Sequence, residues 1–169
     1  MHNACVGYEN LVPLLAPQDI TTNITASGYL NVKNAQRAAF IVFFGNIDSA
    51  TTTNTEVITV ECCTLENAGT EEAIPFYYRL SGAVGANTWG AVTTCASTGL
   101  AITVTDDNKI LWVEVDLSAM QAENDEAFLV RVLATDTDDM ANCLISVIGV
   151  IEPRYAQTTF ISATASASA

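Results

Sequence analysis

Short apolar runs, each bounded by a cluster of Gly, Asn, Asp or Thr, recur along almost the whole chain. Runs of this length fit β-strands, because a helix of a globular domain needs a longer segment with 3.6-residue periodicity. We count about eight or nine runs, at the spacing typical of β-sandwiches and jelly rolls. The expected strands are residues 28–33, 37–45, 56–64, 73–80, 88–95, 100–105, 109–117, 127–134 and 143–151. The sequence therefore predicts an all-β fold, a β-sandwich or a jelly-roll-like domain.

Four segments carry more specific predictions. Residues 37–45 are nearly continuously apolar, which favours a strand buried on both faces. Pro75 cannot donate a ladder hydrogen bond, so its strand is expected at a sheet edge or at a bulge. The run Asp106-Asp107-Asn108 predicts a hairpin turn between two strands, although it lacks Gly. Residues 118–126 are expected to form one helical turn.

The size and composition of the chain favour one folded domain. A chain of 169 residues can bury a core without a metal or a disulfide. Half of its residues are hydrophobic and 15% are charged, a balance that excludes an intrinsically disordered protein. We assign residues 1–27 to an extended N-terminal arm, 28–155 to the β domain and 156–169 to an extended C-terminal tail.

The charge of the chain excludes several partners. Nineteen acidic residues against six basic ones give a formal net charge of −13, and the basic residues are scattered. Because binding to phosphate backbones needs clustered Lys or Arg, we expect no nucleic-acid partner.

The longest apolar stretch, 38–44, is too short to cross a bilayer, so we expect no membrane partner. The first residues do not resemble a targeting leader.

The cysteine and histidine content argues against a metal site or a catalytic centre. The five cysteines have no framework spacing, which fits a reducing compartment, and Cys62 and Cys63 point to opposite faces of their strand. His2 is the only histidine and lies at the terminus, where it has no fixed partner. No nucleophile, phosphate-loop or dinucleotide motif is present. We therefore expect no enzymatic activity, no catalytic residues, no metal and no cofactor.

One acidic loop is the best candidate for a cation site. Asp136, Asp138 and Asp139 could supply converging carboxylate oxygens to calcium. The loop has no Gly at the turn and no Glu downstream at EF-hand spacing, so we favour a solvated acidic loop. Cation binding by residues 136–139 stays open.

Exposed aromatic side chains could bind carbohydrate or anchor a protein interface. The candidates are Trp89, Trp112, Tyr77 and Tyr78. In residues 109–117 the apolar side chains Leu111, Val113, Val115 and Leu117 face one way, and Trp112 faces the other way with Glu114 and Asp116. We favour burial in the core or at a protein interface for these aromatics over a sugar platform.

Four segments resemble a known group of proteins. They are residues 29–45 (YLNVKNAQRAAFIVFFG), 72–82 (EAIPFYYRLSG), 113–116 (VEVD) and 151–155 (IEPRY). Together they are similar to small structural proteins encoded among the head genes of tailed bacteriophages. The similarity runs over most of residues 28–155, and no catalytic residue is part of it.

The resemblance implies a capsid decoration (cement) protein, with a head–tail, neck or tail component as the alternative. Such a protein would bind the major capsid protein on the exterior of the virion, often as a homotrimer, after synthesis in the host cytoplasm. The interface is expected in the leader around residues 11–20 and in the tail after Tyr155. The apolar residues expected to carry it are Leu14, Leu15, Ile20, Phe160 and Ile161. A carbohydrate-binding virion module is a second alternative.

Overall fold

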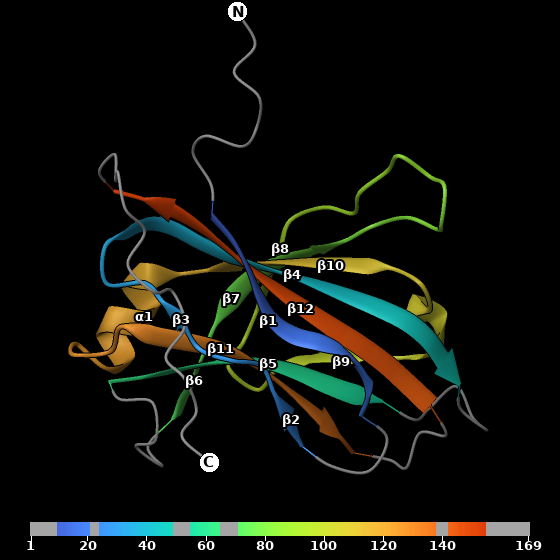
Figure 1. Cartoon of the computed structure of the whole chain (residues 1–169), viewed down its shortest axis with the longest axis horizontal. Coiled ribbons are helices and arrows are strands. Elements are labelled where there is room, and N and C mark those ends of the chain that lie inside the picture. The colour runs from blue at the N-terminus through green and yellow to red at the C-terminus, as the bar shows by residue number, and fades with distance from the viewer. Residues whose placement is uncertain (1–9, 21–23, 49–54, 65–70, 138–141, 155–169) are drawn as a thin grey trace, which may run out of the picture.

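The described part of the chain forms two antiparallel β-sheets packed face to face. The computed structural model describes residues 10–20, 24–48, 55–64, 71–137 and 142–154. Figure 1 shows the two layers, with β4, β8 and β10 lying above β5, β9 and β11. The all-β sandwich expected from the sequence is confirmed. The tail assigned to 156–169 lies outside the described residues.

The first sheet, sheet A, has six strands. Their order is β1 (Asn10–Asp19), β12 (Asn142–Pro153), β4 (Ala35–Asp48), β10 (Ile110–Val115), β7 (Phe76–Leu80) and β8 (Thr93–Cys95). The long strand β4 is central, because β12 pairs along one of its edges and β10 along the other.

The second sheet, sheet B, is built around β5 and β11. Its strand order is β2 (Thr25–Ala26), β11 (Leu129–Asp136), β5 (Glu56–Cys63) and β6 (Glu72–Ile74), while β3 (Leu30–Asn31) also pairs with β11 and β9 (Leu100–Ile102) with β5. A 3₁₀ turn, η1 (Val104–Asp106), and one helix, α1 (Leu117–Glu123), complete the described elements.

Period-two alternation places one apolar face of each sheet in a shared core. The largest fully buried side chains come from both sheets: Phe40, Phe44 and Phe76 from sheet A, and Ile58, Ile74 and Ile102 from sheet B. Leu111, Val113 and Val115 are buried as their spacing predicted. Burying one such side chain is worth about 1.5–3 kcal/mol, so this core is the main source of stability.

Pro75 marks the point where the chain passes from one sheet to the other. The expected single strand 73–80 is divided into β6, which pairs with β5 in sheet B, and β7, which pairs with β10 in sheet A. The proline lies between them, where no ladder hydrogen bond is needed. The strand expected at 88–95 is also shorter, since only Thr93–Cys95 joins the sheet.

The hairpin predicted at Asp106-Asp107-Asn108 is wrong. The strand before the turn, β9, pairs with β5 in sheet B, whereas β10 pairs with β4 and β7 in sheet A. Thr103 starts η1 with a reciprocal capping box to Asp106, and Asn108 adopts a positive φ of 55°. This local hydrogen bonding redirects the chain between the sheets in place of a tight hairpin turn.

The helical turn expected at 118–126 is present as α1, slightly earlier in the chain. Asp116 is its N-cap, and its carboxylate accepts hydrogen bonds from the backbone N–H groups of Ser118 and Ala119, both at 3.0 Å. Met120 is the buried residue of the helix. The cap explains why β10 ends at Val115 and does not continue to Leu117.

The N-terminal arm expected at 1–27 includes a strand of sheet A. Its residues Asn10–Asp19 form β1, the edge strand of sheet A, which pairs antiparallel with β12. Pro13 and Pro17 concealed this strand in the sequence, but an edge strand tolerates proline because one of its edges needs no ladder partner. The register shifts twice along β1, between Pro13 and Leu15 and between Leu15 and Gln18.

Two glycines with positive φ allow a sharp test of packing in sheet B. Gly99, at φ 93°, precedes β9, and a Cβ there would lie 2.6 Å from Val57 Cγ1 and 2.9 Å from the Ile58 carbonyl oxygen. Gly85, at φ 81°, has no atom within 4 Å of such a Cβ. The left-handed conformation alone costs an L-residue about 1–2 kcal/mol.

We expect Gly99→Ala to lower the free energy of unfolding by more than about 3 kcal/mol, because steric overlap adds to the conformational cost. Gly85→Ala is the matched control, and its free energy of unfolding should fall only by the cost of the left-handed conformation, about 1–2 kcal/mol. Urea unfolding followed by circular dichroism measures both variants. Equal losses would contradict the close packing of Gly99 against β5.

Candidate binding face and buried acidic groups

The outer face of sheet A carries several exposed large apolar side chains. The sequence predicted that residues 37–45 are buried on both faces, and this prediction is wrong. In β4, Phe40, Val42 and Phe44 point into the core, while Ile41 and Phe43 point outward, and Phe43 is 44% exposed. The run is apolar on both sides because the outward side chains form an open apolar surface.

The outward residues of three neighbouring strands make this surface continuous. Ile148 of β12 lies opposite Ile41 on one side and Pro13 on the other, and Leu11 of β1 lies opposite Val150. Four of the exposed large hydrophobic residues are on these strands: Leu11 at 63%, Phe43 at 44%, and Leu144 and Ile148 at 38%. We call Leu11, Pro13, Phe43, Leu144 and Ile148 the outer patch.

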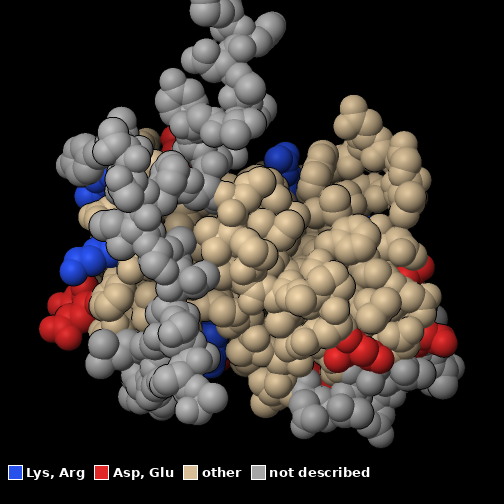
Figure 2. All heavy atoms as spheres, viewed as in Figure 1, with Lys and Arg blue, Asp and Glu red and all other residues tan. Residues whose placement is uncertain are grey.

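The residues of the outer patch are uncharged, so a contact made through them brings no carboxylate of the patch itself into the interface. Figure 2 shows one side of the molecule, on which the visible Asp and Glu residues gather mainly at the left edge and the lower right. Most of the described surface between them in this view is uncharged.

A small groove lies on the other half of the same face. It has a volume of about 230 Å³ and is lined by residues of β4, β7 and β10 and by one loop residue: Arg37, Tyr77, Tyr78, Arg79, Val92, Trp112 and Glu114. Trp112 lies directly opposite Arg79, and Glu114 directly opposite Tyr77. A smaller hollow of about 20 Å³ adjoins the groove at Arg37 and Trp112 and extends over Ala39 towards Val150.

The polar side chains of the groove are held in pairs. The Nε and Nη2 atoms of Arg37 each donate to one carboxylate oxygen of Glu114 at 3.2 Å, and its Nη1 lies 3.7 Å from Glu152. The Arg79 guanidinium lies over the Trp89 ring, 4.9 Å from its centroid. Sequence reasoning missed Arg37, Arg79 and Glu114, because only the sheet register brings them together.

The four aromatic candidates from the sequence lie close to one another. Tyr77 and Trp89 are each 40% exposed, and Trp112 points outward and is half-buried. Tyr78 differs, since it packs partly against the core and contacts Phe76 edge-on at 6.3 Å between ring centroids. Three of the four candidates therefore point to the outside of sheet A.

The expected interface residues of the leader are mostly in the core. Leu14 is 9% exposed and Ile20 is 2% exposed, and Leu15 packs against the same core. The sequence pattern does not show their burial, because Pro13 and Pro17 conceal strand β1. Phe160 and Ile161 lie outside the described residues.

A polar cluster on sheet B links neighbouring strands through hydrogen bonds and ion pairs. Arg131 of β11 lies opposite Glu61 of β5 and donates to it through Nε at 2.8 Å, while its Nη1 donates to the Tyr29 hydroxyl at 2.8 Å. Tyr29 in turn donates to Glu71 at 2.6 Å, and burial together with this hydrogen bond raises the pKa of Tyr29. All three guanidinium nitrogens have partners inside the cluster, and the side chains of Arg131, Glu61 and Glu71 are only 19%, 14% and 18% exposed, so the cluster is little accessible to a ligand.

Glu56 is a carboxyl group buried inside the sandwich. It is 0% exposed, and neither of its oxygens has a hydrogen-bond partner among the described residues. Burial, together with the nearby charges of Asp136 and Asp19, raises the pKa of Glu56 to about 8. Asp136 is its direct partner in the ladder between β11 and β5. Glu56 is therefore mostly protonated at neutral pH.

The acidic loop 136–139 is described only at its first positions. Asp136 belongs to the group around Glu56, while Asp138 and Asp139 lie outside the described residues. Within the described ranges, no three His, Cys, Asp or Glu side chains are placed to hold a metal ion. The buried thiol of Cys143 completes this end of the sandwich, and burial raises its pKa to about 12.

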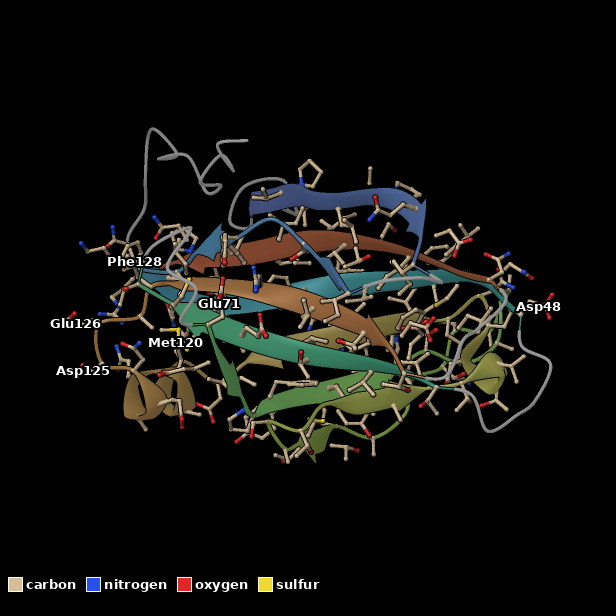
Figure 3. The ribbon with its side chains drawn as sticks, turned by 90° about the horizontal axis from the view of Figure 1, so that it is seen from below. Asp48, Glu71, Met120, Asp125, Glu126 and Phe128 are labelled. Atoms are coloured by element: carbon tan, nitrogen blue, oxygen red, sulfur yellow. The ribbon has the colours of Figure 1, made fainter. Side chains whose placement is uncertain are left out.

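A wider hollow of about 740 Å³ lies at the opposite end of the molecule, next to α1. Four of its lining residues, Met120, Asp125, Glu126 and Phe128, are seen in Figure 3 at the end away from Asp48. The hollow also borders Thr64 and Arg154, each of which is the last residue before an undescribed range. We assign no ligand to it. No helix in the described ranges is both long and apolar enough to span a bilayer.

Comparisons with known proteins give little similarity. No family model matches the chain, and no curated protein matches its sequence. Two solved structures of infectious bursal disease virus, of the Gt and Gx strains, align over 90% and 88% of this chain. Their identities are 7% and 9% and their TM-scores 0.27 and 0.28. The chain spans 43% and 41% of the viral chains it matches, and at these TM-scores the alignments decide nothing about fold or function.

The raised pKa of Glu56 predicts that stability falls as pH rises. The folded chain holds one more proton than the unfolded chain between the ordinary Glu pKa of 4.5 and the folded value of about 8. The stability that this proton contributes is fully present below pH 4.5. Between pH 4.5 and pH 8 the free energy of unfolding decreases by up to about 1.4 kcal/mol per pH unit.

We expect Glu56→Gln to flatten the decrease in unfolding free energy between pH 5 and pH 8, measured by urea unfolding. Glu126→Gln, at an exposed carboxylate, is the matched control and should keep the wild-type slope. If Glu56→Gln keeps the wild-type slope as well, Glu56 is not the buried proton site.

Proposed function

We propose that this chain is a non-enzymatic structural protein of a virus particle, namely a decoration (cement) protein on the exterior of a tailed-bacteriophage head. The outer patch carries the proposal. It is a contiguous apolar surface on sheet A that no described segment covers, and such surfaces mark sites of association in soluble proteins. The sequence resemblance to phage head proteins supports the major capsid protein as the partner.

The mechanism follows from the uncharged nature of the outer patch. Its partner presents an apolar area between capsid subunits, so binding removes both surfaces from water. The contact area exists only in the assembled shell, and binding therefore stabilises the assembled state over the free subunits. Repetition over the lattice converts modest individual contacts into firm retention.

The charge of the chain supports placement outside the shell. A net charge of −13 repels packaged nucleic acid, and the outer patch itself contains no charged residue that would oppose contact. A homotrimer around local threefold positions is the oligomer that the resemblance suggests. A neck or tail component is the alternative within the same class.

Co-sedimentation tests the function directly. Purified protein is mixed with mature heads that lack it, and bound copies are counted against the major capsid protein. Saturable binding at a lattice-like ratio is the expected result. A few copies per head would favour the neck or tail position, and no binding would overturn the decoration role.

Substitutions in the outer patch should weaken this binding. We expect Phe43→Asp combined with Ile148→Asp to reduce the affinity for heads by at least about ten-fold, because two charges would be desolvated in the contact. Both side chains point outward, so the domain should stay folded by circular dichroism. Val84→Asp is the matched control, since Val84 is 77% exposed and lies outside the patch. Unchanged binding by the double variant would exclude the outer patch as the interface.

A further inference from the structure

The groove between Trp112 and Tyr77 has a chemistry that the proposed function does not use. The outer patch occupies β1, β12 and β4, whereas the groove lies over β4, β10 and β7. It adjoins the patch but is lined by charged and aromatic side chains. An apolar side chain of a partner protein inserted there would cover Arg37 and Glu114 without giving either a new hydrogen bond.

The charges of the groove balance, which disfavours an ionic ligand. Arg37 is already paired with Glu114 and Glu152, and Arg79 lies over Trp89. An added carboxylate or phosphate would compete with two resident carboxylates in a chain of net charge −13. The ligand that fits is therefore polar and uncharged.

The pair of Arg37 and Glu114 presents donors and acceptors side by side. Their side chains are 55% and 39% exposed, so both remain accessible from the groove. Neighbouring hydroxyl groups of a sugar each donate and accept one hydrogen bond, and a guanidinium beside a carboxylate satisfies both needs. Hydrogen bonds to charged groups are also stronger than those between neutral groups.

Aromatic rings stand beside this polar pair. Tyr77 is 40% exposed, and Trp112 lies in the next strand over, so both contribute to the wall of the groove. One face of a pyranose ring consists of C–H groups and is apolar, and it packs on an aromatic ring while the hydroxyl groups at its edge stay polar. The combination of apolar wall and polar pair suits a sugar ring better than a purely apolar group.

A second tryptophan is held at the border of the groove. Trp89 forms a bridge with Ser81, and the loop around it is closed by hydrogen bonds from Gly82 N–H to the Thr88 carbonyl and from Gly90 N–H to the Leu80 carbonyl. Arg79, which lines the groove, lies on its ring. The loop therefore fixes the position of Arg79 before any ligand binds.

We propose that the groove formed by Arg37, Tyr77, Trp112 and Glu114 binds a single residue of a neutral saccharide. Its volume of about 230 Å³ is below the roughly 300–1,000 Å³ of pockets for drug-sized ligands, so it takes one sugar ring of a longer glycan. This activity is independent of head binding through the outer patch.

Fluorescence titration tests the site, because Trp89 and Trp112 are the two tryptophans of the chain. The probes are dextran, mannan, a neutral galactan and chitotetraose. We expect a saturable change in tryptophan emission with at least one of them, and isothermal titration calorimetry confirms that binding. Failure of all four probes overturns the proposal.

Variants decide whether the groove is responsible. Tyr77→Ala and Glu114→Gln should each weaken saccharide binding by about ten-fold or more. The first substitution removes an aromatic ring on which the sugar packs, and the second removes the carboxylate that accepts from its hydroxyl groups. Phe43→Ala is the matched control, since Phe43 is an exposed aromatic residue on the same sheet outside the groove. Its saccharide affinity should equal that of the wild type.

Head binding distinguishes this proposal from the proposed function. Tyr77→Ala and Glu114→Gln should bind heads as the wild type does, whereas the outer-patch double variant should bind saccharide normally. If the two groove variants bind saccharide like the wild type, or lose head binding and not saccharide binding, the groove is not a sugar site.

Discussion

The two-layer packing of the sheets is the constraint on which the other features depend. Each sheet has two faces, and the sandwich buries only one face of each. β4 carries apolar residues on both of its faces. Because it is paired on both edges, its orientation is fixed and one of these apolar faces stays outside the core. The result is a stable core formed by Phe40, Val42 and Phe44, and an open apolar surface around Ile41 and Phe43.

That open surface divides into two regions because neighbouring strands contribute different side chains. On one side of β4, β12 and β1 add apolar residues, with Ile148 opposite Ile41 and Pro13 opposite Ile148. β10 and β7 add Trp112, Glu114 and Tyr77 on the other side of β4. The first region suits a dry contact with another protein, and the second suits a ligand that carries both an apolar face and hydroxyl groups.

The acidic end of the sandwich has a different physical character. Glu56 is held inside the protein without a hydrogen-bond partner among the described residues, next to Asp136. Burial is the main cause that raises the pKa of Glu56, and the charges of Asp136 and Asp19 add to it, so Glu56 keeps its proton at neutral pH. Arg131 differs from Glu56, because its guanidinium has hydrogen-bond or ion-pair partners in Tyr29, Glu61 and Glu71.

The sequence alone determined the all-β class, the inward set Leu111, Val113 and Val115, and the outward direction of Trp112, because alternation along a strand is a local property. It did not reveal β1, whose prolines are tolerated only because the strand lies at an edge. Nor did it show that β9 and β10 belong to different sheets. The outer patch and the groove arise from register between strands far apart in the chain, such as Trp112 beside Arg79 and Ile41 beside Ile148. Only the tertiary structure could decide them, because pairing between distant strands depends on the packing of the whole core and not on any local pattern.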